Sequence, residues 1–232
     1  MAPTRPPADA PSDRRLARVQ AVSGLCFLAF VALHLVNLML AARSPAAYNA
    51  FQRALRPLYQ FPPLELGLVM TPLLVHVAAG IRRLRRGPAP RDRRARLHRW
   101  SGIFLLVVIF GHIAAVRGSS LVFGVYPEFE GLELSLWLVP YLFYPYYALF
   151  ALAAVYHALN GAGVALGILG AHVPRTARQD FGFWAPATAG MVLALAGILG
   201  IDGWLYPLPD PTSTEVGRLA ERLLGRSLAW PN

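Results

Sequence analysis

The sequence of 232 residues contains no lysine, a single cysteine and few charged side chains. The lone cysteine, Cys26, excludes an intrachain disulfide, a cysteine-rich iron–sulfur site and covalent haem attachment through a Cys-x-x-Cys-His motif. Only 15% of the residues are charged and 56% are hydrophobic, whereas a soluble domain carries about 25% charged residues. Together with a mean hydropathy of +0.44, these proportions indicate an integral membrane protein.

The absence of lysine leaves arginine as the only basic side chain other than histidine, and the formal net charge is +10. This charge alone would suit a nucleic-acid partner. The arginines, however, lie in the segments that connect apolar stretches, so we expect a topological role and no nucleic-acid partner. Fifteen of the 22 fall on one side of the predicted spans, in residues 5–18, 82–99 and 175–178. The positive-inside rule makes that side cytoplasmic, with the N-terminus inside and the C-terminus outside.

Five apolar segments have about the twenty residues that a helix needs to cross a bilayer. The predicted spans are Val19–Ala42, Leu64–Leu84, Trp100–Val116, Leu136–Leu166 and Phe183–Tyr206. Residues Met1 to Asp13 are rich in proline, alanine and aspartate, and we expect a disordered cytoplasmic tail over residues 1–16 and not a signal peptide. We therefore divide the chain into this tail, a five-helix membrane domain over 17–206 and an outer tail over 207–232. Amphipathic spacing predicts short surface helices within 44–61 and 212–229.

Four histidines lie in four of these apolar segments and form a duplicated pattern. A Ser-Gly pair precedes His34 and also His112, with ten residues from glycine to histidine in both copies. The next span of each copy carries a histidine followed by a glycine four residues later, at His76 and at His157. A single histidine in a membrane helix is often only a hydrogen-bonding group, but polar residues at this depth are costly and usually functional. Four of them in a repeat indicate ligands.

The depth of each histidine predicts which ones pair. At 1.5 Å per residue, His34 and His112 lie roughly 24 Å and 20 Å from the inner ends of their helices, in the outer half of the membrane. His76 lies roughly 9 Å from the inner face, and the repeat places His157 at the same level. A repeat axis along the membrane normal then sets His34 against His112 and His76 against His157. Two bis-imidazole sites about 10–15 Å apart are predicted.

Two facing imidazoles suit the iron of a haem, because they fill both axial positions and leave the metal to electron transfer. Zinc or copper requires three or four ligands together, and the two pairs are too far apart to supply them. Small residues favour a flat macrocycle, because they leave gaps into which its ring can fit. Gly80 and Gly161 lie one turn after His76 and His157, and Ser23 and Ser101 lie near the depth of the same two histidines. We expect His98 and His172, which we assign to loops, to be solvated.

With these residues, the chain resembles the cytochrome b membrane subunit of succinate dehydrogenase/fumarate reductase in its single-chain, five-helix, two-haem form. The resemblance covers about 18–161 and lies in Ser-Gly…His34, His76-x-x-x-Gly80, Arg99-x-Ser-Gly…His112 and His157-x-x-Asn160-Gly161. It implies an all-α integral membrane protein whose first four spans form a haem-binding bundle. It also implies two b haems with His34, His112, His76 and His157 as axial ligands, in the bacterial inner membrane.

The resemblance further implies a flavoprotein and an iron–sulfur subunit docked on the cytoplasmic face, and a quinone, often menaquinone, that reacts near the outer haem. The chain has no flavin or iron–sulfur machinery, so succinate chemistry belongs to those partners. Some relatives carry a glutamate two residues before the histidine of the fourth span, where this chain has Val155, so a proton pathway there is not expected. Glu65, Tyr126 and Glu128 are weak candidates for quinone protonation.

Two other classes remain open from the sequence. One is another bis-histidine membrane cytochrome, of the hydrogenase or b561 type, although those place their histidines on different helices. The other is a haem-free transporter or assembly subunit that uses the histidines for hydrogen bonding or proton relay. The absence of a Soret band would favour the second.

Overall fold

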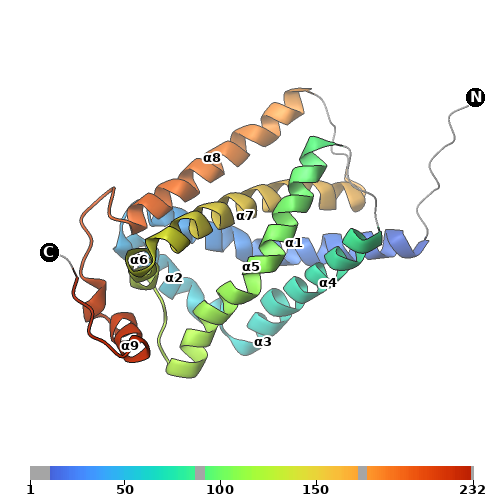
Figure 1. Ribbon diagram of the computed structural model, residues 1–232. Helices are drawn as coiled ribbons and strands as arrows, with labels where there is room; N and C mark the ends of the chain where they lie inside the picture. Colours follow the sequence, from blue (N-terminus) through green and yellow to red (C-terminus); the bar gives the residue numbers. More distant parts are fainter. Residues whose placement is uncertain (1–10, 87–91, 172–176, 231–232) are drawn as a thin grey trace, which may run out of the picture.

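The computed structural model describes residues 11–86, 92–171 and 177–230. Within these ranges the chain is helical and contains no β-strand. Five helical segments are long and apolar enough to cross a membrane: Ser12–Leu40, Pro62–Arg86, Arg93–Phe123, Pro140–Ile168 and Gly182–Ile201 (Figure 1). The prediction of a multi-pass, all-α membrane protein is therefore confirmed.

The five spans are built from seven elements. Four are single helices: α1 (Pro11–Leu40), α5 (Arg93–Phe123), α7 (Pro140–Ile168) and α8 (Ala177–Ile201). The second span is continuous but composite, with α3 (Pro62–Leu64), a π-helical segment η1 (Glu65–Met70) and α4 (Thr71–Arg86). The helix α1 begins at Pro11, so the last residues of the predicted tail are helical, and residues 1–10 lie outside the described ranges.

The predicted fourth span is wrong at its start. Leu136 and the residues up to Leu138 belong to a separate helix, α6 (Phe129–Leu138), and the chain breaks at Val139 before α7 begins. Proline disfavours helical geometry in the residue before it and is well suited to the first position of a helix. Val139 accordingly has φ −139° and ψ 63°, and Pro140 opens α7.

Both predicted surface helices are present, and with α6 they gather at one end of the molecule (Figure 1). They are α2 (Pro45–Tyr59) and α9 (Glu215–Leu224), the latter preceded by the short η2 (Pro211–Ser213). Ser44 caps α2 by accepting a hydrogen bond from the Ala47 amide at 3.1 Å. We call this the cap end. The opposite end, where α4 stops at Arg86 and α5 starts at Arg93, is the arginine end.

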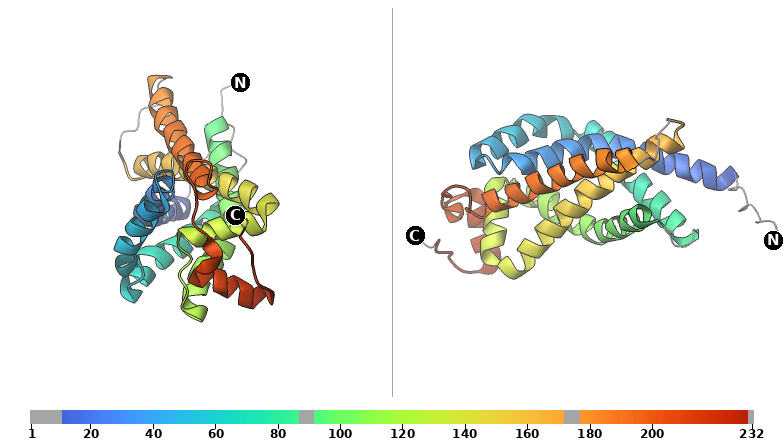
Figure 2. Two further views of the ribbon diagram at one scale, coloured as in Figure 1. Left: turned by 90° about the vertical axis from the view of Figure 1, so that its left-hand side faces the viewer. Right: turned by 90° about the horizontal axis from the view of Figure 1, so that it is seen from above.

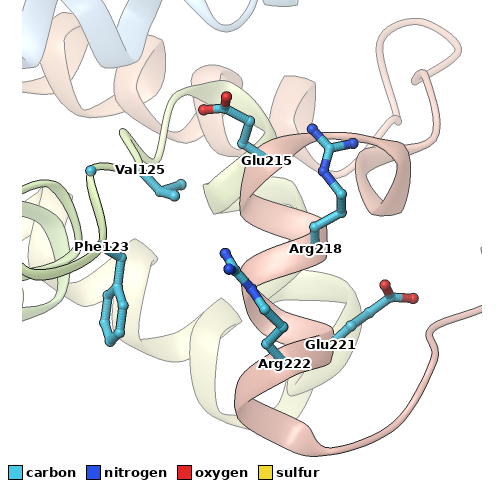
Figure 3. A pocket seen from close by; sticks show the side chains of 7 residues that line it. Phe123, Val125, Glu215, Arg218, Glu221 and Arg222 are labelled. Atoms are coloured by element: carbon cyan, nitrogen blue, oxygen red, sulfur yellow. The ribbon is translucent and has the colours of Figure 1, made fainter.

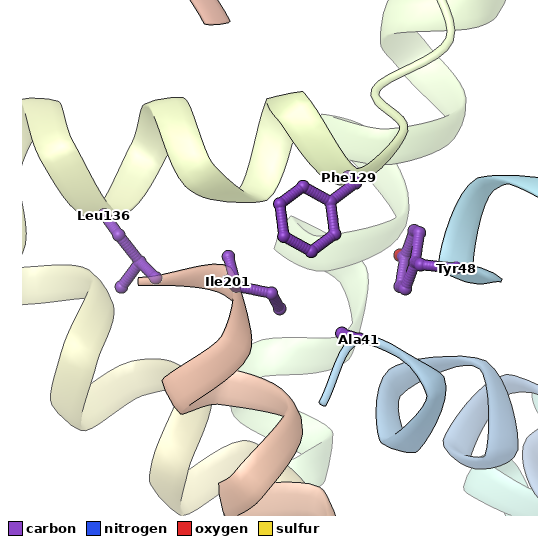
Figure 4. Packing of buried hydrophobic residues seen from close by; sticks show 5 residues of the cluster. All are labelled: Ala41, Tyr48, Phe129, Leu136 and Ile201. Atoms are coloured by element: carbon purple, nitrogen blue, oxygen red, sulfur yellow. The ribbon is translucent and has the colours of Figure 1, made fainter. Parts of the chain in front are cut away.

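A buried cluster joins the cap to the spans (Figure 4). It consists of Ala41, Tyr48, Phe129, Leu136 and Ile201, all at most 6% exposed. These residues come from the turn that follows α1, from α2, from α6 and from the end of α8. The cap is therefore packed onto the helix ends and is not a loose surface attachment.

The fifth span braces the bundle against α1. Seen from above, α8 lies between α1 and α7 (Figure 2), and it contacts both. The approach to α1 is so close that a Cβ at Gly197 would meet the Leu38 carbonyl oxygen at 2.1 Å. A Cβ at Gly200 would meet the Ala41 carbonyl oxygen at 2.2 Å. Small residues that let helix backbones approach are the usual means of packing in membranes.

The four histidine-bearing helices do not pack with equal closeness. In the part of the chain that the structure describes, α1 packs closely on α4 and on α7, whereas α5 packs closely on α7 and not on α4. Figure 1 shows α5 crossing steeply over the other helices. Of the four helices, α4 and α5 are therefore the neighbours that pack least closely on each other.

Candidate functional site: two stacked histidine pairs

The four membrane histidines form two pairs of neighbouring rings. From α1 and α5, the ring centroids of His34 and His112 lie 5.9 Å apart with 68° between the planes. From α4 and α7, the centroids of His76 and His157 lie 6.2 Å apart with 87° between the planes. We call the first the cap-end pair and the second the arginine-end pair. This is the spatial pairing that the depth of the four residues predicts.

The two pairs are stacked along the bundle. On α1, Gly24 lies against His76, and His34 follows ten residues later. On α5, Gly102 lies against His157, and His112 again follows ten residues later. Ten residues of helix span about 15 Å, which is the upper end of the predicted separation.

The imidazoles of the arginine-end pair are oriented by backbone carbonyl groups. Nδ1 of His76 lies 3.1 Å from the Gln20 carbonyl oxygen, and Nδ1 of His157 lies 3.2 Å from that of His98. A carbonyl oxygen only accepts, so Nδ1 carries the proton in both rings and Nε2 keeps its lone pair. This is the arrangement that fixes a metal-binding histidine and raises its basicity.

Glycines make room for these two rings. A Cβ at Gly24 would lie 2.8 Å from Nδ1 of His76, and a Cβ at Gly102 would lie 2.9 Å from Cε1 of His157. In each half of the chain the carbonyl group comes four residues before the glycine, at Gln20 and at His98. The duplication seen in the sequence is therefore also a duplication of contacts.

The neighbouring small residues behave differently from our expectation. A Cβ at Gly80 would meet Nε2 of Gln20 at 3.1 Å, and one at Gly161 would meet Cε1 of His98 at 3.2 Å. These glycines accommodate two side chains of the bundle and do not leave an open gap. Ser101 does lie beside the arginine-end pair, with Oγ 3.2 Å from Nδ1 of His157.

Our expectation that His98 lies solvated in a loop is wrong. Asp92 caps α5 by accepting a hydrogen bond from the Ala95 amide at 2.9 Å, so the helix begins early enough to include His98. Its ring stacks on that of His157, with the centroids 4.1 Å apart and the planes 9° from parallel. His172 lies outside the described residues.

Aromatic rings and not carbonyl groups surround the cap-end pair. Phe30 stacks on His34 at a centroid distance of 5.8 Å, and Phe150 meets His112 edge-on at 5.0 Å. Tyr59, at the end of α2, contacts Phe30 in turn at 5.6 Å. His34 is exposed, whereas the other three histidines are half-buried.

The spacing of the rings fits a metal ion between each pair. A bond from a metal to an imidazole nitrogen is about 2 Å long, so two rings on opposite sides of one ion have centroids about 6 Å apart. Both pairs meet that condition. Among the described residues, no three His, Cys, Asp or Glu side chains are grouped closely enough to hold an ion by themselves. Two imidazoles could hold a group that brings its own equatorial ligands, as haem does.

The three weak candidates for quinone protonation lie at the cap end and contact arginines. Glu65 accepts from Arg117, with Oε2 2.8 Å from the guanidinium. Glu128 accepts from Arg53 and from Arg56, the latter at 2.6 Å. Although burial alone would raise the pKa of Glu128, the hydrogen bonds from these two arginines hold that pKa below its usual value.

The third candidate, Tyr126, lies under a guanidinium, with Arg56 4.2 Å from its ring centroid. Both line a shallow pocket of about 370 Å³ together with Arg117, Gln60 and the segment Phe61–Pro62. The lining of the pocket therefore combines hydrogen-bond donors with apolar side chains, and each of its two arginines is paired with a carboxylate, Glu128 or Glu65.

A second hollow, of about 560 Å³, opens between the end of α5 and α9 (Figure 3). Its wall combines Phe123 and Val125 with the charged face of α9, including Arg218 and Arg222. No histidine lines it. This hollow is therefore separate from both pairs.

Comparison of this chain with models of protein families, with curated proteins and with solved structures finds no match.

Proposed function

We propose that this chain is the membrane anchor and electron-transfer subunit of a succinate dehydrogenase/fumarate reductase, and that it holds two b haems between its histidine pairs. The observation that carries the proposal is the pair of ring arrangements with centroids 5.9 Å and 6.2 Å apart, about 15 Å from each other along the bundle. The haems would supply reversible one-electron transfer across the membrane. The catalytic site for succinate would lie on the partner subunits.

At the arginine end, His76 and His157 would hold the iron through Nε2, because Nδ1–H of each ring donates to a carbonyl group on the adjacent helix. These two rings come from α4 and α7, so a haem held between them would join both halves of the repeat. At the cap end, His34 and His112 would be the second pair of ligands, next to Phe30 and Phe150.

The quinone site of this proposal is the shallow pocket at the cap end. A quinone is a flat, largely apolar ring with two carbonyl acceptors, and Arg56, Arg117 and Tyr126 offer donors around it. Tyr59 and Phe30 connect this region to His34 by successive ring contacts. Glu65 and Glu128 are ion-paired with the arginines of the pocket. In this proposal their main role is to position those arginines as hydrogen-bond donors, and their secondary role is proton exchange with the quinone.

The arginine end is the docking face for the flavoprotein and iron–sulfur subunits in this proposal, with the bacterial cytoplasm on that side. Arg83 and Arg86 lie in the last turn of α4, where positive charge is favoured by the helix dipole. Fewer arginines lie at the cap end, which accords with the positive-inside rule.

The test is a pyridine haemochrome assay with a reduced-minus-oxidised spectrum on the purified protein. We expect two b haems per chain, and one after either His76→Ala or His34→Ala. Cys26→Ala is the control, because Cys26 is exposed on α1. A folded wild-type chain without haem would contradict the proposal and favour a transporter or assembly subunit. Co-purification of a hydrogenase instead of a flavoprotein would favour another class of bis-histidine cytochrome.

A further inference from the structure

One histidine of the arginine-end pair has a ring partner that the other lacks. His98 stacks on His157 in nearly parallel orientation, 4.1 Å between centroids. The same residue supplies the carbonyl oxygen that accepts from Nδ1 of His157. Ser101, one turn later on α5, donates to that carbonyl at 3.0 Å. His157 is therefore held both in its plane and over its face by one turn of α5.

The equivalent position in the other half of the chain is Gln20, and its side chain does not stack on a histidine ring. Its Oε1 accepts from Arg83 at 2.7 Å, and its amide nitrogen lies over Gly80. Of the groups of Gln20, it is the backbone carbonyl that contacts His76. The repeat therefore keeps the backbone contact in both halves and adds the stacked ring in one.

Stacking matters here because an imidazole turns easily about its last side-chain bond. A single hydrogen bond at Nδ1 limits that rotation, and a ring pressed against the face limits it further. Contacts between aromatic rings are worth about 0.5–1.5 kcal/mol beyond the area that they bury. The ring of His157 lies 87° from that of His76, so the restraint maintains two nearly perpendicular ligand planes.

We propose that His98 is a positioning residue, which acts by stacking on His157 and so keeps this ligand perpendicular to His76. The inference rests on the proposed haem function. The orientation of two axial imidazoles determines the splitting of the iron d orbitals, and the low-spin ferric signal therefore reports it directly. Nδ1 of His98 is buried and has no hydrogen-bond partner in the described part of the chain, so a ring without nitrogen can replace it at that atom.

The experiment is electron paramagnetic resonance of the oxidised protein, with haem content measured in parallel. We expect His98→Leu to shift the largest g value of one of the two low-spin signals toward that of parallel ligands. His98→Phe keeps a flat ring and is expected to retain the wild-type signal. Gln20→Leu is the control from the other half of the repeat, and it leaves the stacked ring in place.

A second variant approaches His98 from the opposite helix. A methyl group at Gly161 lies 3.2 Å from Cε1 of His98, so Gly161→Ala pushes the stacked ring and is expected to shift the same signal. Gly163→Ala is the matched control, since a Cβ there meets nothing within 4 Å.

The spectra and haem contents of these variants test the role of His98 separately from the haem function. Unchanged signals in His98→Leu would overturn the inference, and so would a shift in His98→Phe equal to that in His98→Leu. Loss of one haem from His98→Leu with retention in His98→Phe supports it, whereas loss from both overturns it. Absence of haem from the wild-type chain would instead refute the proposed function itself.

Discussion

The arginine-end pair and the cap-end pair come from the same sequence pattern but are held differently. Carbonyl groups orient both rings of the arginine-end pair, and glycines admit them. The rings of the cap-end pair contact Phe30 and Phe150, and among the described residues no hydrogen bond to His34 or His112 is present. A repeated motif therefore predicts where two sites lie but not how rigidly each is built.

This difference suits two different tasks within the proposed function. A rigid pair resembles a fixed relay, whose ligands should move little between oxidation states. A pair in an aromatic wall, with one exposed ring, tolerates the arrival and departure of a neighbouring quinone. Substitutions at one end of the bundle at a time test whether the two pairs are held differently.

The largest effect is expected from closing the glycine gap at the arginine end. Gly102→Ala places a methyl group 2.9 Å from Cε1 of His157 and displaces the ring from its carbonyl partner. We expect haem content to fall from two to one per chain by haemochrome assay. Alanine stabilises a helix by about 0.5–1 kcal/mol relative to glycine, so the loss cannot come from helix propensity. Gly111→Ala, with nothing within 4 Å, is the control on the same helix.

At the cap end, we expect Arg117→Gln to raise the KM for quinone about tenfold, because hydrogen bonds from charged groups are worth about 1.5–3 kcal/mol. The haem spectra should remain as in the wild type. Arg218→Gln changes an arginine that lines the other hollow and is expected to have no such effect. An unchanged KM in Arg117→Gln would exclude this pocket as the quinone site.

The cap also carries a buried acid that makes its stability depend on pH. Glu133 is 2% exposed, and neither carboxylate oxygen has a hydrogen-bond partner among the described residues. Burial, with Glu130 and Asp210 nearby, raises its pKa to about 8. Tyr206, in the segment that follows α8, is a further titratable neighbour.

The sign of the pH dependence follows from that shift. Between the usual value of 4.5 and about 8, the folded state keeps the proton and the unfolded state loses it, so stability decreases as pH rises through this range. We expect Glu133→Gln to remove the decrease and to raise the unfolding temperature at pH 9 by a few degrees. Glu215→Gln, at an exposed position, should not. A parallel pH profile in wild type and Glu133→Gln would contradict the assignment.

The smallest effect is expected from the serines of the repeat. Ser101 lies 3.2 Å from Nδ1 of His157, whereas Ser23 donates to the Val19 and Gln20 carbonyl groups. A neutral hydrogen bond contributes about 0.5–1.5 kcal/mol. Ser101→Ala should therefore speed transfer of the arginine-end haem to an acceptor protein a few-fold, and Ser23→Ala should change it less. Equal effects would mean that the two halves hold their ligands alike.

Local pattern was sufficient to predict the spans and the neighbouring histidines, because both depend on apolar length and on helical rise. It was insufficient where one residue decides a boundary. The break at Val139 follows from Pro140, a signal that was present but outweighed by the apolar run around it. The early start of α5 follows from Asp92, a capping residue within an arginine-rich segment.

Other features depend on contacts between distant residues and have no local signal. Asn49 donates to Glu130 and accepts from the Phe129 amide, about eighty residues away. The stacking of His98 on His157 joins residues 59 apart. The unequal packing of α5 depends on how all the helices fit together. Such contacts arise only when the whole bundle assembles.

The π-helical segment η1 sets an angular relation between the two ends of the second span. A residue inserted into or removed from a helix turns everything beyond it by about 100°. Glu65 opens η1 and faces Arg117, while His76 lies beyond the segment and faces His157. With one residue fewer, a regular helix would turn one of these groups away from its partner. The wider π-helical turn thus lets one continuous helix make both contacts, whereas a regular α-helix would place Glu65 and His76 at the wrong relative angle.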